Sequence, residues 1–245
     1  MKLFDITSIH NTLDERPQEF ENLAQRNKFA CGFVNDDDIA DKTMLNIGCG
    51  FGNFELYALR KKCKLITAID VTDDNMSMLK MSIQDKRVNF LVGNAISLNF
   101  ADNSFDTVVA FDVIEHIPLN TETIMFKEIK RVLKNNGVMY LTTPYDSFFS
   151  KLLDPAYIFG HRHYSKNQLL EYAHNVKFTV ENMLLIGGWW EALSVFDLYF
   201  SKWVLRKKNA LEKYYSKKLE AECNEIKRKN NGFMGIAIKC RNSKL

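Results

Sequence analysis

The stretch 44-MLNIGCGFGN-53 decides the fold. Gly48, Gly50 and Gly52 stand at alternate positions directly behind an apolar run, which is typical of a strand that ends in a tight turn. Two explanations of these glycines stay open at this point. They could supply only backbone angles that other residues avoid, or they could clear a floor on which a nucleotide-like ligand lies against bare peptide.

From residue 44 to about 143, short apolar runs alternate with segments of helical pattern. The runs predict strands over 44–48, 64–70, 87–93, 105–111 and 137–143, and the segments between them predict helices over 53–62, 73–83 and 121–136. Strands that lack polar alternation and are separated by helices indicate a parallel sheet covered on both faces. We therefore predict an α/β core.

The segments on either side of this core predict further elements. After residue 143 the sequence predicts a loop containing FGHRHYS, a helix over 165–174, a strand near 177–185, a long helical stretch over 189–229 and a last strand over 232–240. We divide the chain into an N-terminal helical cover, 1–40, and one domain, 41–245. Within that domain, 186–231 is predicted as a helical insertion before the last strand.

The composition is that of an ordinary soluble globular protein, with 46% hydrophobic residues. A net charge of +3 is too small for a general nucleic-acid surface. The five cysteines are an odd number without a CxxC pair, which argues against a disulfide framework or a thiolate zinc site. No secretory signal pattern opens the chain, because Asp5 and His10 interrupt it, so we expect a cytoplasmic protein.

The glycine turn differs from the dinucleotide fingerprint at one position. That fingerprint is G-x-G-x-x-G, but Asn53 stands where its third glycine belongs, which disfavours a nicotinamide-dependent oxidoreductase. Asp70 follows Gly50 by twenty residues, at the end of the second predicted strand. A carboxylate there suits a bidentate hydrogen bond to a ribose diol. The alternative is that Asp70 caps the helix predicted to begin at residue 73.

Polar groups also follow the next two strands. The third strand ends in GNA, 93–95, where the short side chain of Asn94 could meet the edge of an adenine. The fourth strand ends in AFDVIEHIP, 110–118, and leaves the sheet at its carboxyl edge, where ligands of open α/β sheets bind. These features occur in order along the chain and predict one nucleotide-like ligand.

This set of segments resembles the class I S-adenosylmethionine-dependent methyltransferase family. LNIGCGFG is similar to the first family motif, LDIGCGxG; Asp70 matches the acidic ribose ligand, GNA the adenine-side GDA, and FDVIEHI the fourth-strand motif. The resemblance covers about residues 25–185. It implies a Rossmann-like seven-stranded sheet, mostly parallel, with helices on both faces and an antiparallel last strand. The cofactor that it implies is S-adenosyl-L-methionine, bound by Asn46, Gly48, Cys49, Gly50, Gly52, Asp70, Val71, Asn94, Ala95, Phe111 and Asp112.

Two positions depart from the family pattern. Asn46 replaces an acidic residue that helps to orient the methionine ammonium group, and Asn94 replaces an Asp near the adenine amino group. An asparagine accepts a hydrogen bond at both places but brings no charge. We therefore expect cofactor binding to be weaker by about 1 kcal/mol for each charge-assisted bond lost.

Methyl transfer from a sulfonium needs an acceptor atom placed about 3 Å from the methyl carbon, and a general base matters when the acceptor is a hydroxyl. The catalytic candidates are His116 in IEHI and His161, His163 and Tyr164 in FGHRHYS. They favour O-methylation of a small-molecule, glycosyl or lipid-linked acceptor. A loop that only packs is the alternative. No metal site is predicted, because no Cys or carboxylate pair stands at fitting spacing near His161 and His163.

The sequence also bears on two other functions. Enzymes that methylate the exocyclic amines of DNA bases carry a [DNS]-P-P-[FYW] motif after the fourth strand, where this chain has FDVI, so DNA is not an expected acceptor. A noncatalytic S-adenosylmethionine-binding regulator remains an alternative to an enzyme.

The segment 189–208 carries an unusual amount of apolar side chain. Trp189, Leu193, Phe196, Phe200 and Trp203 recur at helical spacing, and basic residues follow. Residues 202–229 hold ten Lys and Arg against four Glu, a local net charge of +6. This helix could cover the acceptor pocket, form a homodimer contact or lie peripherally on an anionic membrane surface.

Overall fold

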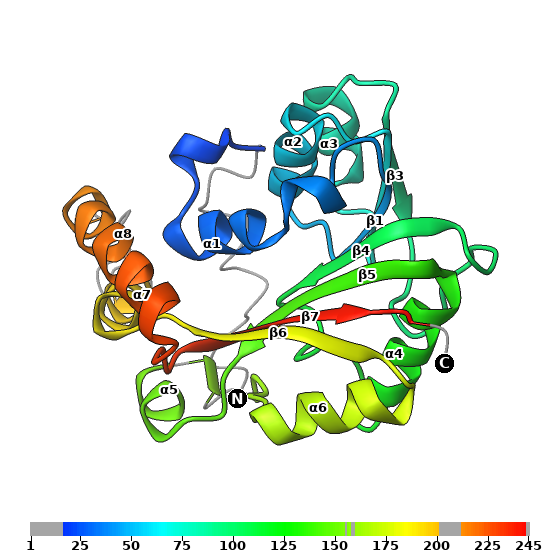
Figure 1. Cartoon of the computed structure of the whole chain (residues 1–245). Coiled ribbons are helices and arrows are strands. Elements are labelled where there is room, and N and C mark those ends of the chain that lie inside the picture. The colour runs from blue at the N-terminus through cyan, green and yellow to red at the C-terminus, as the bar shows by residue number, and fades with distance from the viewer. Residues whose placement is uncertain (1–16, 155, 158–159, 201–211, 244–245) are drawn as a thin grey trace, which may run out of the picture.

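The computed structural model describes residues 17–154, 156–157, 160–200 and 212–243 (Figure 1). Its centre is a seven-stranded sheet in the order β3-β2-β1-β4-β5-β7-β6. The strands are β1 (Thr43–Ile47), β2 (Leu65–Asp70), β3 (Val88–Val92), β4 (Phe105–Phe111), β5 (Leu133–Pro144), β6 (Thr179–Ile186) and β7 (Gly235–Arg241). The inner strands, such as β1 and β4, are buried along nearly their whole length and are mostly apolar, as expected of a sheet covered on both faces.

The strand directions agree with the expected fold class. β1 pairs in parallel with β2 and β4, and the same direction continues to β3 and β5. β7 lies antiparallel to both of its neighbours, β5 and β6. The predicted Rossmann-like sheet with an antiparallel last strand is therefore confirmed.

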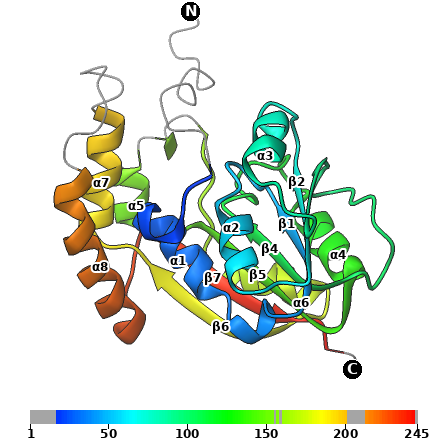
Figure 2. The same cartoon turned by 90° about the horizontal axis from the view of Figure 1, so that it is seen from above.

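Helices cover the two faces of the sheet (Figures 1 and 2). They are α1 (Gln25–Phe33), α2 (Asn53–Arg60), α3 (Met76–Ser82), α4 (Glu122–Val132), α5 (Phe148–Leu153), α6 (Lys166–Asn175), α7 (Trp189–Phe200) and α8 (Glu212–Lys229), with short 3-10 turns at Phe20–Asn22 and Asp36–Asp38. Buried side chains of α4 and α6 join one core cluster, and those of α1 and α2 join another on the opposite face.

Some helix ends differ from the sequence-based expectation. The helix expected over 121–136 ends at Val132, because Leu133 is already buried in β5 and Asn136 has a left-handed φ of 61°. A residue in that conformation cannot continue a right-handed helix. The helix expected over 73–83 begins three residues later, at Met76. In the stretch expected to be helical over 189–229, residues 201–211 lie outside the described residues.

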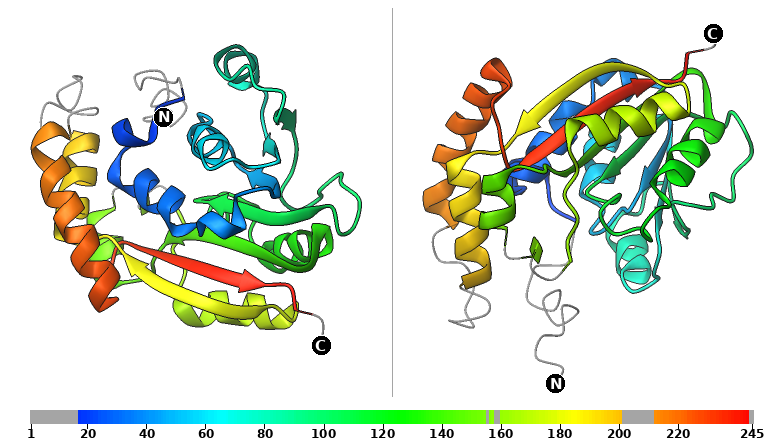
Figure 3. Two further views of the ribbon diagram at one scale, coloured as in Figure 1. Left: turned by 45° about the horizontal axis from the view of Figure 1, so that its top comes forward. Right: turned by 90° about the horizontal axis from the view of Figure 1, so that it is seen from below.

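The two C-terminal helices lie beside the ends of β6 and β7 (Figure 3). The first turn of α7 is capped by α8, because the Glu222 carboxylate accepts hydrogen bonds from the backbone N–H groups of Gly188, Trp190 and Glu191 at 3.2, 2.9 and 3.2 Å. Amides at a helix start have no partner inside the helix, and a carboxylate there also suits the helix dipole. The division of the chain into a cover, 1–40, and a domain, 41–245, stays a prediction.

Among the residues that the structure describes, no helix combines the length and the apolar composition needed to cross a bilayer.

Candidate functional site

All three glycines of the turn have left-handed backbones, with φ of 73° at Gly48, 51° at Gly50 and 76° at Gly52. A Cβ atom at Gly48 would lie 2.5 Å from Val113 Cγ2, and one at Gly52 would lie 2.8 Å from Leu79 Cδ2. A Cβ at Gly50 would meet nothing within 4 Å. Two of the glycines therefore serve close packing as well as backbone angle, whereas Gly50 faces open space.

Asp70, the last residue of β2, lies beside this glycine turn. Its Oδ2 atom accepts a hydrogen bond from the Gly50 N–H at 3.1 Å, and its Oδ1 atom accepts one from the Val71 N–H at 2.8 Å. α3 begins only at Met76, so Asp70 does not cap that helix. The structure thus brings Asp70, Gly50 and the exposed Val71 together, and the binding of a ribose by Asp70 stays a prediction.

Asn46 lies at the end of β1, with 3% of its surface exposed. Its Nδ2 atom donates a hydrogen bond of 2.6 Å to Oε1 of Glu55, a residue that sequence reasoning missed. Burial raises the pKa of the Glu55 carboxyl from 4.5 to about 7, although the hydrogen bond from Asn46 opposes the shift. Within the described part of the chain, Asn46 Oδ1 has no hydrogen-bond partner. Position 46 carries an asparagine in place of the acidic residue of the family pattern, and the carboxyl group of Glu55 lies directly next to that asparagine.

The adenine-side segment lies beside a cavity. Asn94 Oδ1 accepts a hydrogen bond from the Ile96 N–H at 3.1 Å, which fixes the turn after β3, and Ala95 is buried under it. A cavity of about 230 Å³ opens here and is lined by Ile69, Leu91, Val92, Gly93, Asn94, Ser97, Leu98, Asn99 and Phe100. The mostly apolar lining with an amide at its edge is suited to a flat heterocycle.

Asp112 follows β4 with a left-handed φ of 53°. Both of its carboxylate oxygens accept hydrogen bonds of 2.8 Å from the Arg26 guanidinium, and Thr142 Oγ1 lies 3.2 Å from Oδ1. Burial alone would raise the pKa of Asp112, but the Arg26 pair outweighs burial and lowers it. Arg26 also lies 3.3 Å from Glu191 of α7. Sequence reasoning missed this link between α1, β4 and α7.

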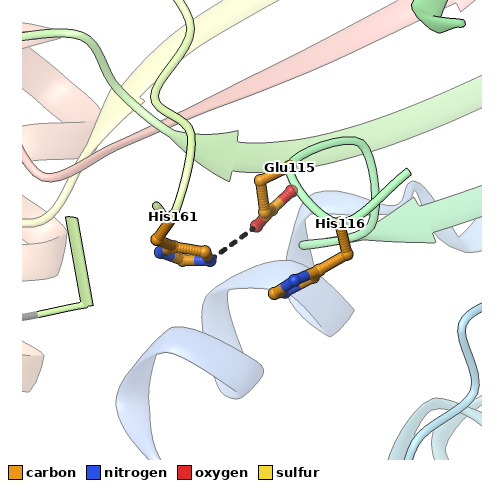
Figure 4. A group of neighbouring side chains, drawn as sticks. All are labelled: Glu115, His116 and His161. Carbon is orange, nitrogen blue, oxygen red and sulfur yellow. Dashed lines mark ion pairs between the residues drawn. The ribbon is translucent and has the colours of Figure 1, made fainter. Parts of the chain in front are cut away.

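Two of the predicted histidines come together beyond β4. The ring centroids of His116 and His161 lie 5.0 Å apart, and Figure 4 shows both rings beside the Glu115 carboxylate. His161 Nδ1 lies 3.2 Å from Asp154 Oδ2, and His161 Nε2 lies 3.9 Å from Glu115 Oε1. The two ring nitrogens of His161 therefore face two different carboxylates.

His163 lies behind His161 and its side chain is fully buried. Its Nε2 atom lies 3.0 Å from Asp154 Oδ2, and its Nδ1 atom lies 3.2 Å from Ser150 Oγ. Hydrogen bonds from the two histidines outweigh burial and hold the pKa of Asp154 below its ordinary range. The geometry assigns His163 to the support of Asp154 rather than to an acceptor.

The two residues that flank His163, Arg162 and Tyr164, hold other groups in place. The Arg162 guanidinium donates to backbone carbonyls within 114–117 and, at 2.6 Å, to Glu122. The Tyr164 hydroxyl lies 3.0 Å from the Ile114 carbonyl and 3.0 Å from Glu122, and burial raises the pKa of Tyr164. The structure therefore places Tyr164 in the core and does not bring it to the histidine pair.

The groups described above gather at one edge of the sheet. The glycine turn follows β1, Asp70 ends β2, Asn94 follows β3 and Asp112 follows β4, all at the carboxyl ends of parallel strands. Ligands of open α/β sheets bind at this edge. His161 joins them from the loop between α5 and α6.

Comparisons with known proteins agree with this arrangement. Residues 45–141 match the family model of a methyltransferase domain. A probable S-adenosylmethionine-dependent methyltransferase of Mycolicibacterium smegmatis is 30% identical over 146 residues, which cover 59% of this chain and 55% of that protein. Phosphoethanolamine N-methyltransferase 2 of Caenorhabditis elegans is 32% identical over 104 residues, which cover 41% of this chain and 23% of that enzyme.

A solved structure extends the likeness to the whole fold. The S-adenosylmethionine-dependent methyltransferase from Mesorhizobium loti superposes with a TM-score of 0.65 at 10% identity, covering 91% of this chain and 99% of that one. The chain spans less than two thirds of the length of both curated relatives named above. Through its motifs, its strand order and the domain match over residues 45–141, the chain is similar to class I S-adenosylmethionine-dependent methyltransferases.

Proposed function

We propose that this protein is a methyltransferase that uses S-adenosylmethionine to methylate an oxygen atom of a small-molecule, glycosyl or lipid-linked acceptor. The observation that carries the proposal is the arrangement of Gly50 and Asp70: a bare glycine faces open space, and a carboxylate is fixed beside it by two backbone N–H groups. This combination suits a ribose lying against peptide.

The rest of the cofactor has a place along the same edge. The adenine is proposed to lie by Asn94 and Ala95, where the cavity opens. The methionine end is proposed to lie over the glycine turn, where the buried Oδ1 of Asn46 can accept a hydrogen bond from the ammonium group. Glu55 keeps the Asn46 amide turned that way by accepting from its Nδ2 atom. Asn46 therefore acts with the Glu55 carboxyl group behind it.

The chemistry at the acceptor rests on His161. Methyl transfer is an in-line displacement: the acceptor oxygen forms a bond to the methyl carbon, and the electron pair of the broken C–S bond stays on sulfur. If His161 donates its Nδ1–H to Asp154, its Nε2 atom carries a lone pair that can accept the hydroxyl proton. The name of the worm relative specifies nitrogen as its acceptor atom, so the proposal of oxygen rests on this histidine and not on that relative.

An exposed apolar surface supports a lipid-linked acceptor among these classes. Its residues lie on α5 and α7 and are Phe148, Phe149, Leu152, Trp189, Leu193 and Phe196. The rings of Phe149 and Trp189 lie 5.0 Å apart, which joins the two helices into one surface. Exposed patches of this kind mark interaction sites. Peripheral membrane contact through 189–208 and a homodimer both stay proposals. The structure does not describe the side chain of Phe200 or any part of Trp203.

The test is transfer of labelled methyl from S-adenosylmethionine into an extract of the source cells, partitioned between organic and aqueous phases. Asp70→Ala should lower S-adenosylmethionine affinity by about 100-fold, because it removes a bidentate acceptor of the ribose, and should abolish transfer. Retention of affinity within about threefold would mean that the ribose lies elsewhere.

The acceptor side is tested with a matched pair of histidine variants. His161→Ala should lower turnover by on the order of 10²-fold while leaving cofactor affinity unchanged. His174→Ala, at an exposed position of α6, should change neither. Binding of S-adenosylhomocysteine without turnover on any extract would instead indicate a regulatory S-adenosylmethionine-binding protein.

A further inference from the structure

One buried carboxylate oxygen on the acceptor side lacks a hydrogen-bond partner among the described residues. The Glu115 side chain is 0% exposed, and its Oε2 atom accepts a hydrogen bond of 3.0 Å from Thr143 Oγ1. Its Oε1 atom is equally buried and has no hydrogen-bond partner in the described part of the chain. Leaving such an atom unpaired in the interior is costly, so its presence points to a ligand.

Two imidazoles face this oxygen. A carboxylate oxygen of Glu115 and one ring nitrogen each of His116 and His161 all lie within 4.8 Å of one another. Figure 4 shows the three side chains arriving from two segments, the loop after β4 and the loop before α6. Ligand atoms about 2.1 Å from one metal ion are at most ~4.2 Å apart. Side-chain shifts of up to about 1 Å therefore bring these three atoms around an ion.

The other ring nitrogen of His161 is already oriented. Its Nδ1 atom lies 3.2 Å from Asp154 Oδ2, which leaves Nε2 directed at Glu115. Metal-ligating histidines almost always donate their second N–H to a carboxylate or carbonyl in this way. Asp154 itself is a poorer ligand, because its Oδ2 atom also accepts from His163 and its Oδ1 atom accepts from the Ala156 N–H at 2.9 Å.

The charge around this place also favours a cation. Two guanidinium groups lie nearby: Arg26 pairs with Asp112 and Glu191, and Arg162 pairs with Glu122. Among the described residues, the two remaining carboxylates, Glu115 and Asp154, form ion-pair contacts only with histidines, and all five carboxylates are buried or partly buried. An additional positive charge at the Glu115 oxygen would offset this excess.

We propose that Glu115, His116 and His161 bind a divalent first-row transition-metal ion, such as Zn²⁺, Mn²⁺ or Fe²⁺. Two imidazole ligands disfavour Mg²⁺ and Ca²⁺, which prefer oxygen. The expectation from sequence of no metal site rested on residues near His161, whereas the fold supplies Glu115 and His116, which lie 46 and 45 residues before His161 in the chain.

Three protein ligands leave coordination positions open, as in catalytic metal sites. The role of the ion rests on the proposed function. The acceptor hydroxyl binds at an open coordination position and releases its proton to water. Its oxygen then attacks the methyl carbon, while the electron pair of the broken C–S bond remains on sulfur. When the ion is bound, the Nε2 lone pair of His161 is used to coordinate it and is not available to accept a proton. Coordination of the hydroxyl to the ion then takes the place of proton removal by His161.

The experiment uses the full chain, treated with a chelator and then titrated with Zn²⁺ in a calorimeter. The wild-type protein should bind about one equivalent, and Glu115→Gln should weaken binding at least 10-fold. His116→Ala should weaken Zn²⁺ binding to the same extent. Because the His116 side chain is exposed, this variant should fold and still test the site if Glu115→Gln does not fold. His174→Ala, on the exposed side of α6, should bind Zn²⁺ as the wild type does.

Three outcomes would overturn the proposal: no Zn²⁺ binding to the wild-type protein, Zn²⁺ affinity in both Glu115→Gln and His116→Ala that equals that of the wild type, or loss of binding in His163→Ala alone. The last would assign the ion to the Asp154, His161 and His163 group instead. Because the titration needs neither cofactor nor acceptor, Zn²⁺ binding without methyl transfer leaves the site standing and removes only the proposed function. Methyl transfer that is unchanged after the ion is removed would contradict its role in activation.

Discussion

The cofactor side of the site, around Gly50 and Asp70, is held mainly by backbone hydrogen bonds, whereas the acceptor side, around Glu115 and His161, is held by ion pairs between side chains. Gly48 and Cys49 donate their N–H groups to the Ile69 carbonyl at 2.8 and 3.0 Å, and the Gly50 N–H reaches Asp70. On the acceptor side, guanidinium groups fix the loop after β4 from outside the sheet.

This difference has a physical consequence for how each side responds to change. Backbone bonds survive most substitutions of side chains, so the cofactor side should fail mainly through glycines and through Asp70. A buried ion pair fails when one partner is removed, because the other charge stays behind without compensation. We therefore expect substitutions on the acceptor side to cost folding stability and those on the cofactor side to cost binding.

The largest effect is expected at Arg26. Arg26→Leu would leave Asp112 and the nearby Glu191 without their shared cation, so the free energy of unfolding should fall by about 3–5 kcal/mol. Urea denaturation measures this change. Lys28→Leu, a substitution in the same helix, is the control and should have a small effect. A loss below about 1 kcal/mol for Arg26→Leu would show that the ion pairs do not hold the acceptor side.

Glu55 should make the stability of the cofactor side depend on pH. The pKa of Glu55 in the folded protein, about 7, lies above the ordinary value of 4.5. The folded state therefore favours the protonated carboxyl more than the unfolded state does. This contribution is complete below pH 4.5 and is lost as pH rises through about 7, by up to ~3 kcal/mol. In Glu55→Gln the unfolding free energy should lose this slope.

The measurement is urea denaturation at several values between pH 5 and 8, in roughly unit steps. Glu171→Gln, at an exposed position of α6, is the control and should follow the wild-type curve. Parallel curves for the wild type and Glu55→Gln would contradict the assignment of this pKa to Glu55.

The smallest effects separate the two kinds of glycine in the turn. Gly48→Ala should destabilise the protein by roughly 1–3 kcal/mol, since its Cβ would clash with Val113. Gly50→Ala meets no atom within 4 Å, so its cost in stability should be only the ~1 kcal/mol of a left-handed alanine. If Gly50 is the floor under the cofactor, however, S-adenosylmethionine affinity should fall more in Gly50→Ala than in Gly48→Ala. The reverse order would place the cofactor elsewhere.

Sequence reasoning reached the cofactor side because its contacts are close along the chain. Asp70 lies twenty residues from Gly50, and both stand in short motifs that the backbone geometry requires. Glu55 was missed although it lies only nine residues from Asn46. A carboxylate in the first turn of a helix is usually solvated and gave no signal of its burial.

The acceptor side was less accessible to the same reasoning. Arg26 and Asp112 are 86 residues apart, and nothing in either local sequence specifies the other. Glu115 stood inside the motif VIEHI, but its importance comes from an unpaired buried oxygen, which only the fold reveals. Tyr164 was selected for its residue type, and its position in the core follows from tertiary packing.

The place of β7 also sets an order for biosynthesis. This strand comes after β5 and β6 along the chain, yet it lies between them and pairs with Val138–Pro144 on one side and Thr179–Ile186 on the other. On the ribosome, β5 and β6 must therefore wait with unpaired edges until residues 235–241 have emerged. The glycine turn and Asp70 emerge much earlier. A nascent chain can thus form its glycine turn while the far side of its sheet still has unpaired strand edges.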